Sequence, residues 1–115
     1  MASDPNRVID LSELTRAGEV RNLSGHQRGV AARTEYHLEE LDVGDEPVEV
    51  RVPTDVYTIT PSFFQGMFAD SVHHLGNDRE QFLAHYHFIV DEVLLQQIER
   101  GLSAILTERN VSRVH

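Results

Sequence analysis

The chain contains no cysteine and no lysine, and each absence excludes a class of chemistry. Without cysteine there are no disulfides, no cysteine-based zinc sites and no thiol nucleophile, which fits a reducing compartment. Without lysine there is no Schiff-base chemistry and no P-loop lysine to hold the phosphates of a nucleotide. All ten basic residues are arginine, against 19 acidic residues. The resulting net charge of −9 repels phosphates and therefore disfavours nucleic acid as a partner.

Long apolar runs are missing as well. No stretch approaches the roughly 18 apolar residues of a membrane-spanning helix, and residues 1–5 lack the basic and apolar parts of a signal peptide. We therefore expect a cytoplasmic protein with no membrane partner. The 115 residues, 40% of them hydrophobic, suffice for one packed core. We expect a disordered leader over residues 1–6, a single domain over residues 7–109 and a frayed tail over residues 110–115.

Strand-like and helix-like patterns follow each other along the chain. Strands are expected at residues 8–14, 48–53 and 82–88, with a turn between 15 and 22 that holds a second short extended piece around Val20. Helices are expected to begin near His26, at Pro61 and after Asp91, which can cap the last of them. This order predicts an α/β sandwich in which helices pack against a mixed or mostly parallel sheet.

Thr60 and Pro61 mark the clearest junction in the chain. Upstream, residues 48–53 alternate as a strand with one buried face. Thr60 suits the N-cap of the following helix, and Pro61 suits its first position, where a missing N–H costs nothing. The turn leaves unpaired N–H groups and the positive end of the helix dipole beside Thr60 and Ser62. It is therefore a candidate for a regulated or ligand-contacting site.

The helix that follows this junction carries apolar residues at helical spacing. Gly76 is expected to end it, and Gly66 in its interior indicates close packing against the sheet. A serine at the second position of a helix is more often a first-turn residue than a nucleophile, and no Gly-x-Ser-x-Gly turn surrounds Ser62. The apolar positions are Phe63, Phe64, Met67, Phe68, Val72 and Leu75.

The first helix opens with Ser24 and Gln27 at the spacing of a capping box. Its apolar side is expected to carry Val30, Thr34, Leu38 and Leu41. The carboxylates of Glu35, Glu39, Glu40 and Asp42 are adequately explained as a solvated face. A plain cap is the simpler interpretation of the helix start, but a loop that holds an anion at a helix N-terminus is an alternative. Its residues would be Ser24, Gly25, Arg28 and Arg33.

His85 and His87 are the candidate metal ligands, because alternate residues of a strand point the same way. Two imidazoles do not complete a site, and further ligands would have to come from His73, His74 or a carboxylate elsewhere. Histidine pairs are more often structural or solvent-facing, so we expect no metal and no cofactor. The alternative function is a small metal-dependent enzyme using these histidines, or a nucleotide-sensing module using the loop at 24–33.

The stretch Ile59-Thr60-Pro61-Ser62-Phe63-Phe64, with Gly66-Met67-Phe68 behind it, resembles the bacterial STAS-like domain of unknown function. Arg28-Gly29-Val30-Ala31-Ala32-Arg33 is similar to that family too, and the resemblance spans Leu23 to Thr107. It implies a small single-domain STAS-like sandwich related to anti-sigma-factor antagonists. It also implies a non-enzymatic regulatory protein that docks on another protein, such as a histidine-kinase-type ATPase or a sigma regulator.

Anti-sigma-factor antagonists carry Asp-Ser-Ser/Thr-Gly at this turn, and the partner kinase phosphorylates the serine after the aspartate. The resemblance places Thr60 at the aspartate, Pro61 at the phosphoacceptor, Ser62 next and Phe63 at the glycine. Pro61 cannot be phosphorylated, so only Thr60 or Ser62 can take that role here. We therefore expect the turn to be a docking surface first and a phosphorylation site second. The expected partner-binding residues are Asp55, Tyr57, Thr60, Pro61, Ser62 and Phe63.

Overall fold

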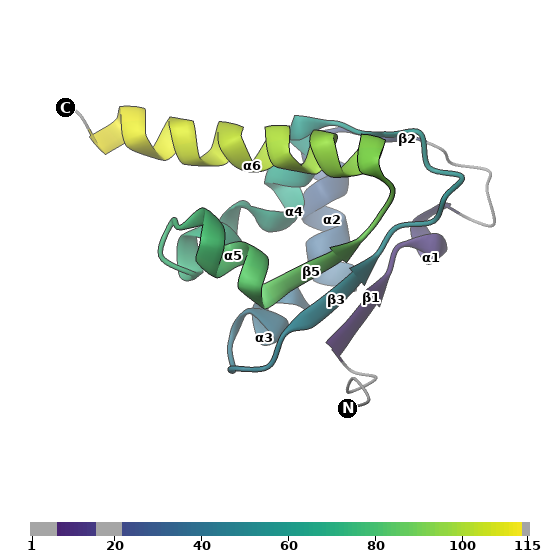
Figure 1. Cartoon of the computed structure of the whole chain (residues 1–115), viewed down its shortest axis with the longest axis horizontal. Coiled ribbons are helices and arrows are strands. Elements are labelled where there is room, and N and C mark those ends of the chain that lie inside the picture. The colour runs from purple at the N-terminus through teal and green to yellow at the C-terminus, as the bar shows by residue number, and fades with distance from the viewer. Residues whose placement is uncertain (1–6, 16–21, 114–115) are drawn as a thin grey trace.

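The computed structural model describes residues 7–15 and 22–113, and this part of the chain is an α/β fold made mostly of helix (Figure 1). The expected leader, the extended piece around Val20 and the last two residues lie outside the described residues. In chain order the elements are β1 Val8–Asp10, α1 Ser12–Thr15, β2 Asn22–Leu23, α2 His26–Glu35, α3 Leu38–Asp42, β3 Val48–Arg51, β4 Thr58–Ile59, α4 Pro61–His74, α5 Arg79–His85, β5 Tyr86–Ile89 and α6 Glu92–Arg113.

The strands form two small parallel sheets rather than the one sheet that we expected. Three strands pair in the order β1-β3-β5, and β2 pairs with β4. The strand that enters α4 is therefore β4 of the second sheet, and residues 52–57 separate it from β3. The expected junction of the strand at 48–53 with the helix is therefore interrupted by β4, because the chain changes sheets in between.

One face of the three-stranded sheet packs against the helices. Ile9, Val50 and Tyr86 point to this face and are buried, whereas Arg51 and His87 on the other face are exposed. Figure 1 shows α2 and α4 behind the sheet and α6 across its upper end. Helix α6 contacts α4 and β4. In the described part of the chain, no helix is both long and apolar enough to cross a membrane.

Helices α2 and α4 cross at two glycines. A Cβ atom at Gly29 would lie 2.1 Å from the carbonyl oxygen of Phe63, and one at Gly66 would lie 2.1 Å from the carbonyl oxygen of His26. Neither distance is possible for real atoms, so the two backbones touch only because both side chains are absent. The expectation of close packing at Gly66 is correct, but its partner is α2 and not the sheet.

The boundaries of α4 and the start of α6 agree with the sequence signals. The Thr60 side chain accepts a hydrogen bond of 3.2 Å from the backbone N–H of Phe63, and Pro61 occupies the first turn. Gly76 follows the helix with a positive φ of 89°, and its N–H donates to the carbonyl of His73. Asp91 accepts from the N–H of Leu94 at 2.9 Å, as expected for a cap.

The first helix differs from the prediction at both ends. Gly25 is its N-cap and makes no side-chain cap bond, so the capping box with Ser24 does not define this terminus. At the other end His37 adopts the left-handed conformation, with φ 56°, and divides the segment into α2 and α3. The buried face of α2 is formed by Gly29, Ala32 and Arg33, while Val30 is 43% exposed.

Residues 79–85 are helical, although alternation predicted a strand over 82–88. Asp78 accepts hydrogen bonds from the N–H groups of Glu80 and Gln81, at 2.8 and 3.3 Å, and so caps α5. Phe82 and Tyr86 are four residues apart, so they satisfy helical spacing as well as strand spacing. Both rings are buried in a cluster with Phe64, Phe68 and Phe88.

Candidate functional site

The turn over residues 58–64 is held from two directions by hydrogen bonds that its backbone N–H groups donate. The N–H of Thr60 donates to the carbonyl of Leu23 at 2.9 Å, which extends the pairing of β2 with β4. The N–H of Ile59 donates to Oε1 of Gln97 in α6 at 2.6 Å. The turn is thus fixed to both sides of the fold before any partner binds.

Pro61 and Ser62 are exposed on this fixed turn. The Ser62 hydroxyl lies 3.2 Å from the Thr60 hydroxyl, which already accepts from Phe63. Tyr57, just before the turn, is 60% exposed, whereas Phe63 is buried. Five of the six expected partner-binding residues therefore have at least part of their side chain at the surface, and Phe63 belongs to the core.

Asp55 is the remaining polar residue near the turn, and it is half-buried. Its Oδ1 atom is shielded from solvent and has no hydrogen-bond partner in the described part of the chain. A buried oxygen without a donor costs folding free energy. Among the described residues, the Oδ1 atom of Asp55 is therefore a buried acceptor that finds no donor.

The residues of the expected anion loop do not converge. Arg28 is exposed near the start of α2, whereas Arg33 points into the core, where it pairs with Asp42. Gly25 has a positive φ of 93°, and Ser24 is half-buried. Arg33 is occupied by its carboxylate, so only Arg28 remains available to an anion from solution.

A buried polar cluster, formed by Arg33, Asp42, Ser71 and Tyr86, joins α2, α3, α4 and β5. Arg33 donates to Asp42, to the Ser71 hydroxyl at 2.8 Å and to the carbonyl of Met67 at 3.1 Å. Ser71 and Tyr86 both donate to Oδ1 of Asp42. Burial, and then the hydrogen bond to Asp42, raise the pKa of Tyr86 well above its usual range.

This cluster was missed at the sequence level, because Asp42 was assigned to a solvated face. The available signal was the pair of small buried positions beside Arg33 on the same helix, namely Gly29 and Ala32. A charged residue in register with such a face has to be buried, and burial requires a partner of opposite charge.

The two candidate metal ligands belong to different elements and differ in their exposure to solvent. His85 is the last residue of α5 and is buried, with its Nε2 atom 2.7 Å from the carbonyl of Leu41. His87 is exposed on β5. The prediction that they share one face of a strand was wrong, because β5 begins only at Tyr86. Within the described ranges, no three potential ligands gather into a metal-binding group.

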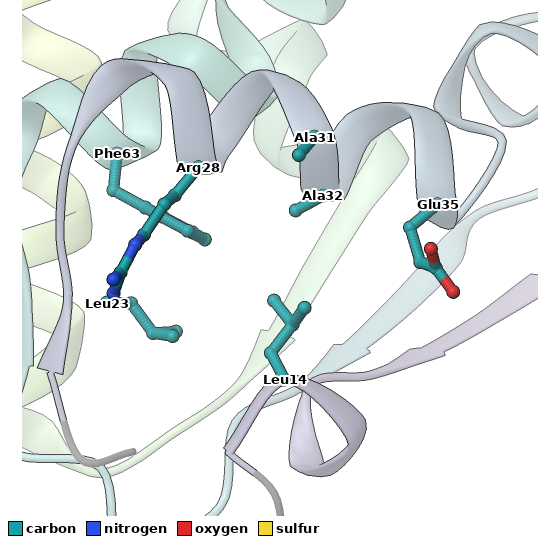
Figure 2. A pocket seen from close by; sticks show the side chains of 7 residues that line it. All are labelled: Leu14, Leu23, Arg28, Ala31, Ala32, Glu35 and Phe63. Atoms are coloured by element: carbon teal, nitrogen blue, oxygen red, sulfur yellow. The ribbon is translucent and has the colours of Figure 1, made fainter.

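A cleft of about 350 Å³ lies beside the turn, between α2 on one side and α1 and β2 on the other (Figure 2). Phe63 reaches it from the start of α4 and so connects the cleft to the turn at 58–64. Arg28 and Glu35 are its charged residues. The full lining consists of Leu14, Leu23, Arg28, Ala31, Ala32, Glu35 and Phe63.

The chain was also compared with known proteins. No protein-family model, curated protein or solved structure matches it.

Proposed function

We propose that this chain is a non-enzymatic regulatory domain that docks on a protein partner through the turn at residues 58–64. The observation that carries the proposal is that this turn is exposed to solvent and is also fixed by hydrogen bonds to the rest of the fold. Pro61 and Ser62 are open to solvent, while the adjoining Thr60 and Ile59 are hydrogen-bonded to β2 and α6. A rigid exposed turn loses little conformational entropy on docking, which favours affinity.

Tyr57 supports the same proposal from the flank of the turn. Its ring is 60% exposed and lies three residues before the cap. Tyrosine is enriched at protein interfaces because a rigid ring buries much apolar area and its hydroxyl still finds a hydrogen-bond partner. Tyr57 is therefore the expected aromatic anchor of the docked complex.

Ser62 is the expected point of regulation. Its hydroxyl is exposed, whereas that of Thr60 caps α4, so a phosphate on Thr60 would disrupt the cap. A phosphate on Ser62 would lie at the N-terminus of α4, which favours negative charge, so folding would be preserved. Its charge and hydration would instead change the docking surface.

The partner is expected to be a cytoplasmic protein with a basic contact surface, since this chain carries a net charge of −9. The resemblance to STAS-like domains favours a histidine-kinase-type ATPase or a sigma regulator. Such a partner also supplies the kinase that a serine switch requires. Docking of this kind needs no cofactor from this chain.

The test compares Ser62→Asp with Ser103→Asp, a matched change at an exposed serine in the middle of α6. Histidine-kinase-type ATPases from the source organism are purified and titrated with each variant by calorimetry. We expect Ser62→Asp to change the affinity for one of them by about tenfold, with unfolding midpoints that match the parent. Ser103→Asp should leave the affinity unchanged.

Two results would contradict the proposal. If Ser62→Asp lowers stability and affinity together, Ser62 has only a structural role in the first turn of α4. If Tyr57→Ala and Ser62→Asp both leave the affinity for a bound partner unchanged, docking uses another surface. Mass spectrometry after incubation with ATP then shows whether the bound ATPase phosphorylates Ser62 or Thr60.

A further inference from the structure

The cleft beside α2 has the size and the walls of a small-molecule site. Its volume of about 350 Å³ falls within the usual range of ligand pockets, roughly 300–1,000 Å³. Five of its seven lining residues are apolar, and all seven belong to the described part of the chain. Figure 2 shows Leu14 reaching up from α1 toward Ala32 of α2, with Leu23 and Phe63 closing one end. The side chains that line the cleft are therefore apolar except for one charged residue at each end.

Arg28 stands at one of these ends, and no carboxylate among the described residues pairs with it. The chain has 19 acidic residues and ten arginines, but not every described arginine pairs with a carboxylate. Arg33, Arg51 and Arg79 each pair with an acidic side chain, and Arg7 donates to backbone carbonyls. Among the arginines whose side chains are described, only Arg28 and Arg100 have no hydrogen bond or ion pair to a described residue. Of these two, Arg28 lines a cleft.

The two ends of the cleft carry opposite charges. Arg28 and Glu35 lie on the same helix seven residues apart, which is about two turns, or roughly 10 Å along the axis. Figure 2 shows the Arg28 side chain extending toward Leu23, at the end opposite to Glu35. Arg28 also lies in the first turn of α2, where the helix dipole adds positive potential. An anionic group is thus favoured at the Arg28 end and repelled at the Glu35 end.

We propose that this cleft binds an apolar monocarboxylate of the medium-chain fatty acid class. The carboxylate pairs with Arg28, and the aliphatic tail lies along Leu14, Ala31 and Ala32. A guanidinium matches a carboxylate with two parallel hydrogen bonds, and a flexible tail fits a wall of leucine, alanine and phenylalanine. This inference does not rest on the protein-docking function, because the ligand and the surface it uses are different.

The first experiment titrates the full chain with decanoate, decanol and acetate by calorimetry, below the concentrations at which micelles form. Decanoate should bind and should raise the unfolding temperature, because it binds only the folded state. Decanol tests the tail without the charge, and acetate tests the charge without the tail. Both should bind at least about tenfold more weakly than decanoate. The net charge of −9 opposes non-specific binding of an anion, so a preference for decanoate over decanol is diagnostic.

Variants locate the site. Arg28→Gln should weaken decanoate binding by about tenfold or more and remove the preference over decanol, whereas Arg100→Gln on exposed α6 is the matched control and should change neither. Ala31→Phe places a large ring in the cleft from an exposed position, so it should abolish binding while the protein stays folded. Methyl resonances of Leu14 and Ala32 should shift with decanoate, and those of Val43 should not.

The proposal is overturned if decanoate does not bind, or if decanol binds equally well. It is also overturned if Arg28→Gln and Arg100→Gln have equal effects. Loss of decanoate binding in Ala31→Phe, together with unchanged partner affinity, would support the ligand site alone. If Tyr57→Ala abolishes partner binding and retains decanoate binding, the docking turn and the ligand site are separate.

Discussion

Arg33 and Asp42 form an ion pair inside the protein, with side chains 10% and 5% exposed. The pair joins the inward face of α2 to the end of α3, across the left-handed residue His37 that separates the two helices. Arg33 binds the Oδ2 atom of Asp42, and the Ser71 and Tyr86 hydroxyls both donate to its Oδ1 atom. The pair therefore holds α3 against α4 and β5, and its loss should destabilise the core.

Removing one partner of this pair should be costly. Arg33→Met leaves the Asp42 carboxylate buried without a cation, and we expect a loss of about 3–5 kcal/mol in the free energy of unfolding. Urea unfolding followed by circular dichroism measures it. The double variant Arg33→Met with Asp42→Leu should recover much of the loss, because it removes both charges. Equal losses in the single and double variants would contradict this prediction.

Alkaline pH should destabilise the fold through Tyr86, whose pKa is raised by burial from the ordinary value of 10.0. Below pH 10.0 the tyrosine is protonated in both states and its contribution is constant. Above it the unfolded chain releases the proton of Tyr86 first, so Tyr86 alone lowers the free energy of unfolding by at most about 1.4 kcal/mol per pH unit. Burial also raises the pKa of Tyr36, which adds to the fall and persists in Tyr86→Phe. Tyr86→Phe should flatten this fall, and Tyr57→Phe at an exposed position is the control. An identical slope in all three proteins would exclude Tyr86 as the cause.

Even an added methyl group at the crossing of α2 and α4 should destabilise the fold. In an open helix Gly→Ala gains roughly 1 kcal/mol, but Gly29→Ala and Gly66→Ala place a Cβ against backbone carbonyl oxygens. We therefore expect each to lose roughly 2–3 kcal/mol of stability, as in overpacked cores. Gly76→Ala, with open space around its Cβ but a positive φ, should lose only about 1 kcal/mol. The denaturant concentration at the unfolding midpoint measures each change in stability. A Gly66→Ala protein that is more stable than the parent would contradict the tight crossing.

Substitution of Asp55 should raise the stability of the fold and weaken the binding of the partner. Asp55→Ala removes a shielded oxygen that has no donor in the described part of the chain, so we expect an increase in stability on the order of 1 kcal/mol. If Asp55 serves the partner, the same variant should bind it more weakly. Asp45→Ala in an exposed loop is the control and should change neither. A destabilised Asp55→Ala protein would show that the carboxylate has a structural role.

Local signals in the sequence predicted the elements whose ends are marked by side chains. Thr60, Pro61 and Gly76 bound α4, and Asp91 caps α6, because each acts on the backbone beside it. Asp78 is a cap of the same kind, but it was not recognised, and the alternation of Phe82, Ala84 and Tyr86 predicted a strand. At this spacing an aromatic pair fits a helix and a strand equally well, so the cap should have decided.

Contacts between residues far apart in the sequence could not be predicted from such local signals. His37 ends α2 in a left-handed conformation without the glycine that usually marks one. Arg33 and Asp42 read as surface charges until α4 and β5 are placed around them. Of the candidate site, the exposed turn at 61–62 was predicted from the sequence. The cleft was not, because Leu14, Ala32 and Phe63 come together only in the fold.

The strand order has a consequence for how this chain folds during synthesis. Val8 pairs with Glu49 and Val48 with Tyr86, so neither sheet contains a hairpin, and each pairing in the described residues spans a helical connection. Non-local pairings of this kind form slowly, because loop closure comes before the contacts that repay it. The edge of β3 that β5 covers stays unpaired on the ribosome until residues 86–89 emerge. A chaperone that shields β3 during that interval should therefore increase the yield of folded protein.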